Sequence, residues 1–278
     1  MATAKDVGQT QQFSVRDFLQ GYEIPTLPEV FFKCLKCARD EKSSDIELAR
    51  LIATDEGIGG KVLERAGGTL SLSPVQAVSK LGRERIIGIL LAASIETNLR
   101  HINPQNISLK DHWVYSTFVG CAVQNVCVKY SLMTEVDPFS VGVLHNVGEL
   151  VMLDHIDAGL AQKLMEADTV GERLEIEKEV LGFTHQQLTI AIMKDWNLPI
   201  EYYLAMRSSY APPVDTPSQL EQALAMAIHI VQLDAFDCPN YWQGVDAEDK
   251  EYLNDATIAQ IYEKTASDLN EYIAIMGI

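Results

Sequence analysis

Apolar residues recur along this chain at the spacing of α-helices, and no sustained alternation of apolar and polar residues predicts a β-strand. Helix-capping residues divide the pattern into separate helices. Ser44 with Glu47 and Thr184 with Gln187 have the spacing of capping boxes, and a serine precedes Pro74 at another helix start. The pattern therefore predicts an all-α fold.

One predicted helix differs from the others because polar side chains interrupt a strongly apolar stretch. Asp137 as the N-cap and Pro138 as the first residue predict a single helix that runs to about Asp154. Apolar residues cover most of its circumference, so we expect it to be central and buried. It also contains two small residues, which should let neighbouring backbones come close, and two polar residues, which need hydrogen-bond partners. These four are Gly142, Gly148, His145 and Asn146.

A break in the helical pattern lies between His101 and Ser108, because Pro104 cannot continue a helix. We expect two helical lobes packed side by side, one before this break and one after it. The predicted domains are an N-terminal extension (1–20), an N-terminal helical lobe (21–100), a second helical lobe (101–236) and a C-terminal helical extension (237–278).

Composition limits the classes of partner that the protein is expected to bind and the cellular compartment in which it is expected. The net charge of −17 argues against a nucleic-acid partner, because phosphate binding needs clustered Lys and Arg. The longest apolar run, Ile86–Ile95, is too short to span a bilayer, and no stretch resembles a secretory signal. Five cysteines without a regular framework suit a reducing environment. We expect a cytoplasmic protein without a membrane segment, in which Cys34 and Cys37 are packing thiols and not a zinc or redox site.

The apolar helix also carries a family resemblance. Val141–Leu150 resembles the metal-binding helix Gly-Leu-Leu-His-Asp-Ile-Gly-Lys-Leu of the HD phosphohydrolases, with Asn146 in place of the aspartate. Further segments resemble, in the expected order, those of the HDOD family, the HD-related output domain of bacterial signalling proteins. They are Ile24-Pro-Thr-Leu-Pro-Glu-Val30, Leu48-Ala-Arg-Leu-Ile-Ala-Thr-Asp55, Lys61-Val-Leu63, Ala77-Val-Ser-Lys-Leu-Gly82 and Asp195-Trp-Asn-Leu-Pro199. The resemblance implies an HD-like second lobe and a degenerate relative of the HD and HD-GYP metal-dependent phosphohydrolases.

The resemblance also implies where a site lies. HD enzymes hold one or two divalent metals with histidine and aspartate side chains. The positions that keep such a ligand here are His145, His185 and Asp234, and those that depart from the ligand set are Tyr115, Asn146, Ser209 and Tyr210. Asn146 brings no charge, and the Tyr115 phenol is a poor ligand near neutral pH because its pKa is about 10. We predict a vestigial binding pocket with no catalytic residue, cofactor or metal. If a metal is bound, the three kept residues are its ligands.

Simpler interpretations of the same residues are also open. His145 fits a hydrogen-bonded core histidine, with Asn146 as its partner or as a backbone anchor. His185, directly after a cap residue, fits a surface position at a helix start, and Asp234, near a helix end, fits an exposed carboxylate. These interpretations differ from the site hypothesis in the burial and the partners that they predict.

Three functions remain as hypotheses. The first is a non-catalytic bacterial signalling or regulatory module, which binds either partner proteins or a small ligand, the ligand lying in the former metal pocket. The second is a metal-dependent phosphohydrolase that acts on a nucleotide or cyclic dinucleotide with unusual ligands, and the third is a helical scaffold protein. The missing ligands favour the first. The identity of the partner and the oligomeric state do not follow from the sequence.

Overall fold

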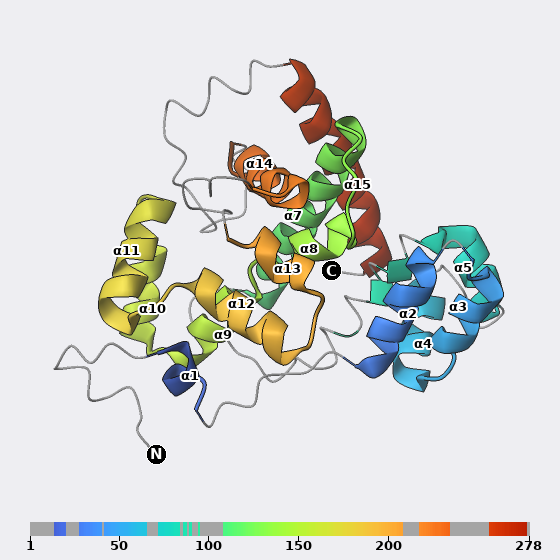
Figure 1. The fold of residues 1–278 in the computed structure, drawn as a ribbon, viewed down its shortest axis with the longest axis horizontal. Coiled ribbons are helices and arrows are strands. Elements are labelled where there is room, and N and C mark those ends of the chain that lie inside the picture. Colours follow the sequence, from blue (N-terminus) through green and yellow to red (C-terminus); the bar gives the residue numbers. More distant parts are fainter. Residues whose placement is uncertain are drawn as a thin grey trace. The chain divides into compact units, whose positions relative to one another are not determined.

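The computed structural model describes residues 14–20, 28–40, 42–65, 72–83, 86–87, 89–90, 94, 108–207, 217–233 and 256–276. Every regular element in these ranges is a helix, which confirms the predicted all-α fold (Figure 1). The helices are α1 (Val15–Phe18), α2 (Glu29–Arg39), α3 (Asp45–Ile52), α4 (Glu56–Arg65), α5 (Pro74–Leu81), α7 (Leu109–Lys129), α8 (Pro138–Leu144), α9 (Val147–His155), α10 (Ala158–Met165), α11 (Val170–Leu181), α12 (His185–Asp195), α13 (Ile200–Ala205), α14 (Gln219–Leu233) and α15 (Ala256–Met276).

The predicted caps set the starts of several helices. Ser44, Ser73 and Thr184 each accept a hydrogen bond from the backbone N–H three residues later, and the side chain at that later position accepts one from the cap backbone. These reciprocal bonds satisfy N–H groups that the first helical turn leaves without a partner. Gly182 ends α11 in the left-handed region, at φ 83°, which favours glycine. The capping prediction is therefore confirmed at these helix ends.

By internal contacts the chain divides into two units. One consists of Pro25–His101 with Asn270–Ile278, and the other of Met1–Ile24 with Ile102–Leu269. In the first unit α3 packs against α2, α4 and α5 around a core that includes Leu48 and Ile52. Outside the named helices, residues 83, 86, 87, 89, 90 and 94 are helical.

The Cys34 and Cys37 thiols belong to this first unit, and both are free and buried. Burial raises the pKa of the Cys34 thiol to about 12, and the neighbouring Cys37 adds to the effect. A thiol with so high a pKa carries almost no thiolate near neutral pH, and thiolate is the form that binds metal or reacts. Both thiols are buried as the packing role predicts, and the absence of a zinc or redox site stays a prediction.

In the second unit α7 is the central helix, and it packs against α8 and α14 (Figure 1). The part of α15 that belongs to this unit also contacts α7. Phe118 lies edge-on to Tyr262, with ring centroids 5.9 Å apart, and Asn125 donates a hydrogen bond of 3.0 Å to Asp268. None of the described helices combines the length and the apolar character needed to cross a bilayer.

The prediction of a single helix from Asp137 to about Asp154 is wrong. The structure has two helices there, α8 and α9, which are separated at His145 and Asn146. Asn146 leaves the helical region, with φ −116° and ψ 18°. The two halves pack against different neighbours, α8 against α7 and α9 against α12. The break lets each half follow its own neighbour, and it places the two polar residues between them.

Candidate functional site

His145 lies at the break, where it ends α8, and its side chain is buried. Its Nδ1 lies 2.6 Å from the carbonyl oxygen of Gly142, and since a carbonyl only accepts, Nδ1 donates. In the neutral ring the lone pair is then on Nε2. Burial lowers the pKa of His145 to about 3, so the ring is neutral at ordinary pH. The interpretation as a hydrogen-bonded core histidine is confirmed, with a backbone carbonyl as the partner.

Asn146 is fully buried, and its side chain bonds to a residue that sequence reasoning did not consider. Its Nδ2 donates to Oε2 of Glu149, one turn further along α9. The Oδ1 atom of Asn146 has no hydrogen-bond partner among the described residues. The expected partnership of Asn146 with His145 is therefore replaced by a bond to a buried carboxylate.

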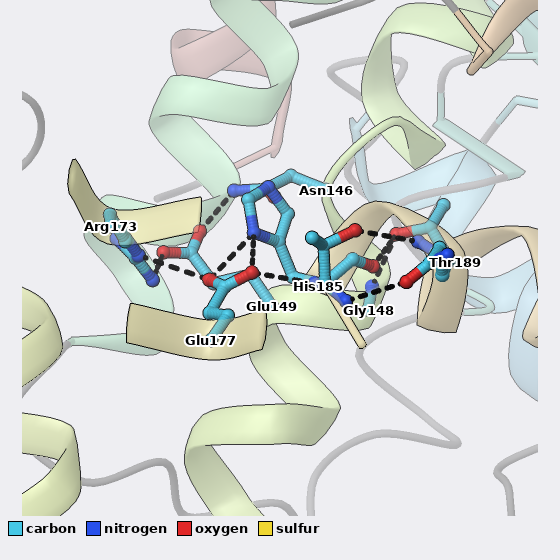
Figure 2. Close-up of polar contacts among 9 residues, drawn as sticks. Asn146, Gly148, Glu149, Arg173, Glu177, His185 and Thr189 are labelled. Carbon is cyan, nitrogen blue, oxygen red and sulfur yellow. Dashed lines mark hydrogen bonds and ion pairs between the residues drawn. The ribbon is translucent and has the colours of Figure 1, made fainter. Parts of the chain in front are cut away.

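A buried ion cluster lies beside this pair, and it joins α9, α11 and α12 (Figure 2). Arg173 on α11 forms an ion pair through Nη2 with Oε1 of Glu149, and its Nε lies 3.4 Å from Oε1 of Glu177. The two glutamate side chains are completely buried, and that of Arg173 is 6% exposed. A single guanidinium thus contacts carboxylates from two helices, and all three side chains are almost completely buried.

His185 is the first residue of α12, and it is bound to the same cluster. Its backbone N–H donates to Oε2 of Glu177 at 2.8 Å, and its Nδ1 lies 2.8 and 2.9 Å from the two carboxylate oxygens. Because a carboxylate accepts, Nδ1 donates, and Glu177 holds both the ring and the start of the helix. The interpretation of His185 as a surface group is wrong, because the residue is completely buried.

Gly148 brings α9 and α12 into direct contact, as the sequence predicted. Its N–H donates to Oγ1 of Thr189 at 2.9 Å, and the same hydroxyl donates to the carbonyl oxygen of His185 at 3.0 Å. A Cβ at position 148 would overlap that carbonyl and lie 2.5 Å from Thr189 Oγ1. Figure 2 shows this contact next to the ion cluster. The absence of a side chain at Gly148 therefore sets the distance between the two helices that carry Asn146 and His185.

Helix α7 also contributes side chains to the buried polar core, by which we mean the cluster of Asn146, Glu149, Arg173, Glu177 and His185 together with His145. Tyr115 is 6% exposed, and its ring centroid lies 5.6 Å from that of His145. His112, one turn earlier, is completely buried, and burial lowers its pKa to about 4, which the charge of Glu149 partly opposes. His112 and His185 both add to the lowering of the pKa of His145, of which burial is the main cause.

The structure thus brings together four of the seven residues predicted for the site. Tyr115, His145, Asn146 and His185 all line the buried polar core. Ser209, Tyr210 and Asp234 lie outside the described residues. Their assignment to the site stays a prediction.

The sequence analysis did not identify the residues that surround these four or bond to them. They are His112, Glu149, Arg173, Glu177 and Thr189. Glu149 had a detectable signal, because it is a charged residue within the apolar run from Val147 to Leu153. Arg173 and Glu177 had none, since opposite charges four residues apart usually form an exposed pair on a helix surface. Their burial comes from the packing of α11 against its neighbours.

The described side chains do not form a ligand set for a divalent metal. Two features favour a metal, because the Nδ1 atoms of His145 and His185 are anchored in the way that orients histidine ligands. The carboxylates oppose it, since Glu149 is bound by Arg173 and Asn146, and Glu177 by His185. In the described part of the chain, no three His, Cys, Asp or Glu side chains are grouped so that they could hold a metal ion.

Comparison with known proteins identifies the family. Residues 24–212 match the HDOD domain, which is more than half of the chain. The chain belongs to the HDOD family. This confirms the resemblance found in the six sequence segments. A search of curated proteins found no match.

Solved structures with the same fold include other HDOD proteins. An HDOD domain protein of unknown function from Geobacter sulfurreducens has a TM-score of 0.69 at 18% identity, over 94% of this chain and 91% of that one. A candidate phosphohydrolase from Shewanella amazonensis SB2B has a TM-score of 0.67 at 20% identity, over 94% and 97%. A candidate signal transduction protein from Marinobacter aquaeolei VT8 has a TM-score of 0.71 at 18% identity, over 97% of this chain and 62% of that one. At these identities the similarity shows the fold alone.

Proposed function

We propose that this HDOD protein is a non-catalytic signalling or regulatory module that acts by binding signalling proteins, or a small ligand, while its HD site is vestigial. The observation that carries the proposal is the internal pairing of the polar core. Glu149, Glu177 and His185 are completely buried and bond to one another or to Arg173 and Asn146. Groups that are buried and paired in this way hold helices together, and we infer that they are not presented to a substrate.

The burial of the site residues supports the same conclusion, because a substrate must be able to reach catalytic groups. A phosphate ester must reach its catalytic groups, and a charged phosphate is costly to move out of water. His145 and Asn146 are at most 2% exposed, and Tyr115 is 6% exposed. The site residues that are described therefore offer no solvent-facing histidine or carboxylate. Binding through the protein surface does not need them to be accessible.

The experiment measures metal content and turnover on the same purified full-length protein. We expect iron, manganese, nickel and zinc to be far below one equivalent after dialysis. We also expect no hydrolysis of cyclic dinucleotides or nucleoside phosphates when divalent ions are added. Near-equimolar metal that survives dialysis, or turnover that depends on added metal, would refute the proposal.

A second function has one observation in its favour. The anchored Nδ1 atoms of His145 and His185 are the arrangement expected of metal-binding histidines, which supports a metal-dependent phosphohydrolase with unusual ligands. In that case loss of the His185 ring should remove both bound metal and turnover. His185→Gln tests this, and an unchanged metal content in that variant would count against the enzyme.

Binding assays separate the signalling module from a helical scaffold. A module that responds to a small ligand should show a rise in melting temperature with one compound of a nucleotide and metabolite panel, because a ligand that binds only the folded state stabilises it. A module that binds proteins should form a saturable complex with a signalling protein. A protein that does neither fits the scaffold hypothesis.

A further inference from the structure

One aromatic side chain attaches the short helix α1 to the rest of its unit. Phe18 is the buried residue of α1, and α1 packs against α12 (Figure 1). The Phe18 ring meets two other rings edge-on, with centroids 4.5 Å from that of His155 and 5.0 Å from that of Phe183. Edge-to-face contacts at such distances are favourable for aromatic pairs. Phe18 is therefore docked on an aromatic site that His155 and Phe183 form.

The two residues of this aromatic site differ in their access to solvent. His155 is the last residue of α9, and it is exposed. Phe183 is buried, and it lies in the link between α11 and Thr184, the N-cap of α12. Because one of its two residues is exposed, the aromatic site can be reached from solvent once Phe18 leaves it.

The described side-chain hydrogen bonds of α1 are local. The Ser14 hydroxyl accepts from the backbone N–H of Asp17, and the Asp17 carboxylate accepts from the Ser14 backbone. These two bonds form a capping box, and they do not link α1 to another helix. A helix of four residues is too short to be stable by itself in water, so α1 depends on the burial of Phe18. A segment held in this way should open more easily than the core helices of its unit.

We propose that α1 is a displaceable internal ligand of the aromatic site, and that the site also binds a short helical segment of a partner protein. The partner segment carries one phenylalanine in the place of Phe18, because α1 shows that this chemistry fits the two rings. While α1 is docked the site is closed, and when α1 is released the partner segment takes its place. This inference rests on the proposed function, since it assigns a surface and a class of partner to a protein-binding module.

Amide hydrogen exchange of the unmodified full-length protein measures the release of α1. The amides of Phe18 and Leu19 are hydrogen-bonded within α1 and its cap, and that of Leu188 is hydrogen-bonded at the start of α12. We expect the two α1 amides to exchange at least about 100-fold faster than that of Leu188, because weakly packed segments open at a much lower free energy than core helices. Equally slow exchange would overturn the proposal, since α1 would then be a permanent part of the core.

Phe18→Ala in the full-length protein opens the aromatic site. Alanine is the better helix former, so a loss of protection at Leu19 in this variant reports lost docking and not lost helix propensity. The probe is a peptide with the sequence of residues 14–20 at millimolar concentration, and magnetic resonance of the His155 ring reports its binding. We expect saturable binding to Phe18→Ala, and at least about tenfold weaker binding to the unmodified protein, in which α1 occupies the site.

Gln20→Ala is the matched control, because Gln20 is exposed at the same end of the segment. This variant should behave like the unmodified protein, and a peptide with alanine in the place of Phe18 should not bind. The proposal is overturned if the peptide fails to bind Phe18→Ala, or if it binds the unmodified protein equally well. The exchange measurement needs no variant, so the proposal stays falsifiable if Phe18→Ala does not fold. Neither experiment measures metal content or turnover, so failure here is distinguishable from failure of the proposed function.

Discussion

The hydrogen bond between Asn146 and Glu149 has a fixed direction, because the amide donates and the carboxylate accepts. Asn146→Asp replaces that donor with a second anion beside a buried carboxylate. We expect a loss of about 1–3 kcal/mol in the free energy of unfolding near neutral pH, and no gain in turnover. Like-charge repulsion and burial should raise the pKa of one carboxyl above its unfolded value. The folded state then binds a proton more readily than the unfolded state, so the loss should shrink as pH falls towards about 4.

Asn125→Asp is the control for this substitution. Asn125 also donates to a carboxylate, that of Asp268, but the contact is only partly buried. Water screens the new repulsion there, so we expect a smaller loss that changes less with pH. Urea denaturation of both variants at pH 7 and pH 5 measures the difference. Equal losses at the two positions would mean that burial of the Asn146–Glu149 contact is not the cause, and turnover in Asn146→Asp would mean that one residue had silenced a complete site.

The lowered pKa values of the completely buried His112 ring and the buried His145 ring predict how stability depends on pH. Burial lowers the pKa of His145 to about 3 and that of His112 to about 4, whereas an unfolded histidine titrates near 6.5. Between these limits the unfolded chain binds protons that the folded core does not. Stability should therefore fall as pH drops from about 6.5 towards 4, by up to about 1.4 kcal/mol per pH unit for each ring.

The measurement for this prediction is the free energy of unfolding from pH 7 to pH 4.5 for the unmodified protein and for His145→Gln. The variant lacks one of the two titrating rings, so its slope against pH should be smaller. Proton magnetic resonance of the His145 ring gives an independent check. A ring that titrates between pH 6 and 7 would contradict the predicted neutral state.

At the scale of single residues, the sequence predicts some residues of the site but not the hydrogen bonds and ion pairs that connect them. The resemblance predicts that His145, Asn146 and His185 belong to one site, because all three lie at positions that resemble those of the HD ligand set. It gives no information on Arg173 and Glu177, which do not belong to the quoted motifs. Whether such an i, i+4 pair is exposed or buried depends on which face of α11 meets the rest of the protein, and that is decided by tertiary packing.

Among the elements, the contact of α9 with α12 is the most sensitive to a single added atom. In Gly148→Ala the new Cβ would meet backbone atoms of α12, which cannot move without shifting the helix. We expect a loss of at least about 1–3 kcal/mol, from overpacking, and a disturbed start of α12 at His185. Chemical denaturation and the circular dichroism of the folded protein measure this loss.

Gly60→Ala is the matched control, because α4 has nothing within 4 Å of a Cβ at that position. Alanine has the higher helix propensity, so this variant should be more stable by about 0.5–1 kcal/mol. A Gly148→Ala protein as stable as the unmodified one would show that α9 and α12 can separate at no cost. That result would contradict the role assigned to the glycine.

The helices themselves were predictable because their signals are local. Ser44, Ser73 and Thr184 mark helix starts through bonds made within three residues. The break between α8 and α9 was not predictable, because every residue from Val141 to Leu153 is compatible with a continuous helix except for the polar pair. The break arises where two halves of one apolar stretch pack against different helices, and that competition is not visible in a local pattern.

For the whole molecule, charge is the property most open to a simple test. The chain has 39 Asp and Glu residues against 22 Lys and Arg, which gives a net charge of −17. Such an excess destabilises the compact state through self-repulsion. Raising the salt concentration from about 0.01 M to 0.15 M shortens the Debye length from about 30 Å to 8 Å. We expect the melting temperature to rise by a few degrees over this range, because long-range repulsion is screened more strongly than the buried pairs around Arg173.

Replacing Glu175 and Glu179 with glutamine tests the origin of that rise. Both side chains are exposed on α11, so the substitutions remove two negative charges without entering the buried cluster on the same helix. The double variant should melt higher than the unmodified protein at low salt, and the difference should narrow as salt is added. Calorimetry at both salt concentrations measures it, with an uncharged osmolyte as the solvent control. A melting temperature that falls with salt would mean that the surface ion pairs, such as Lys33 with Glu29, outweigh the net repulsion.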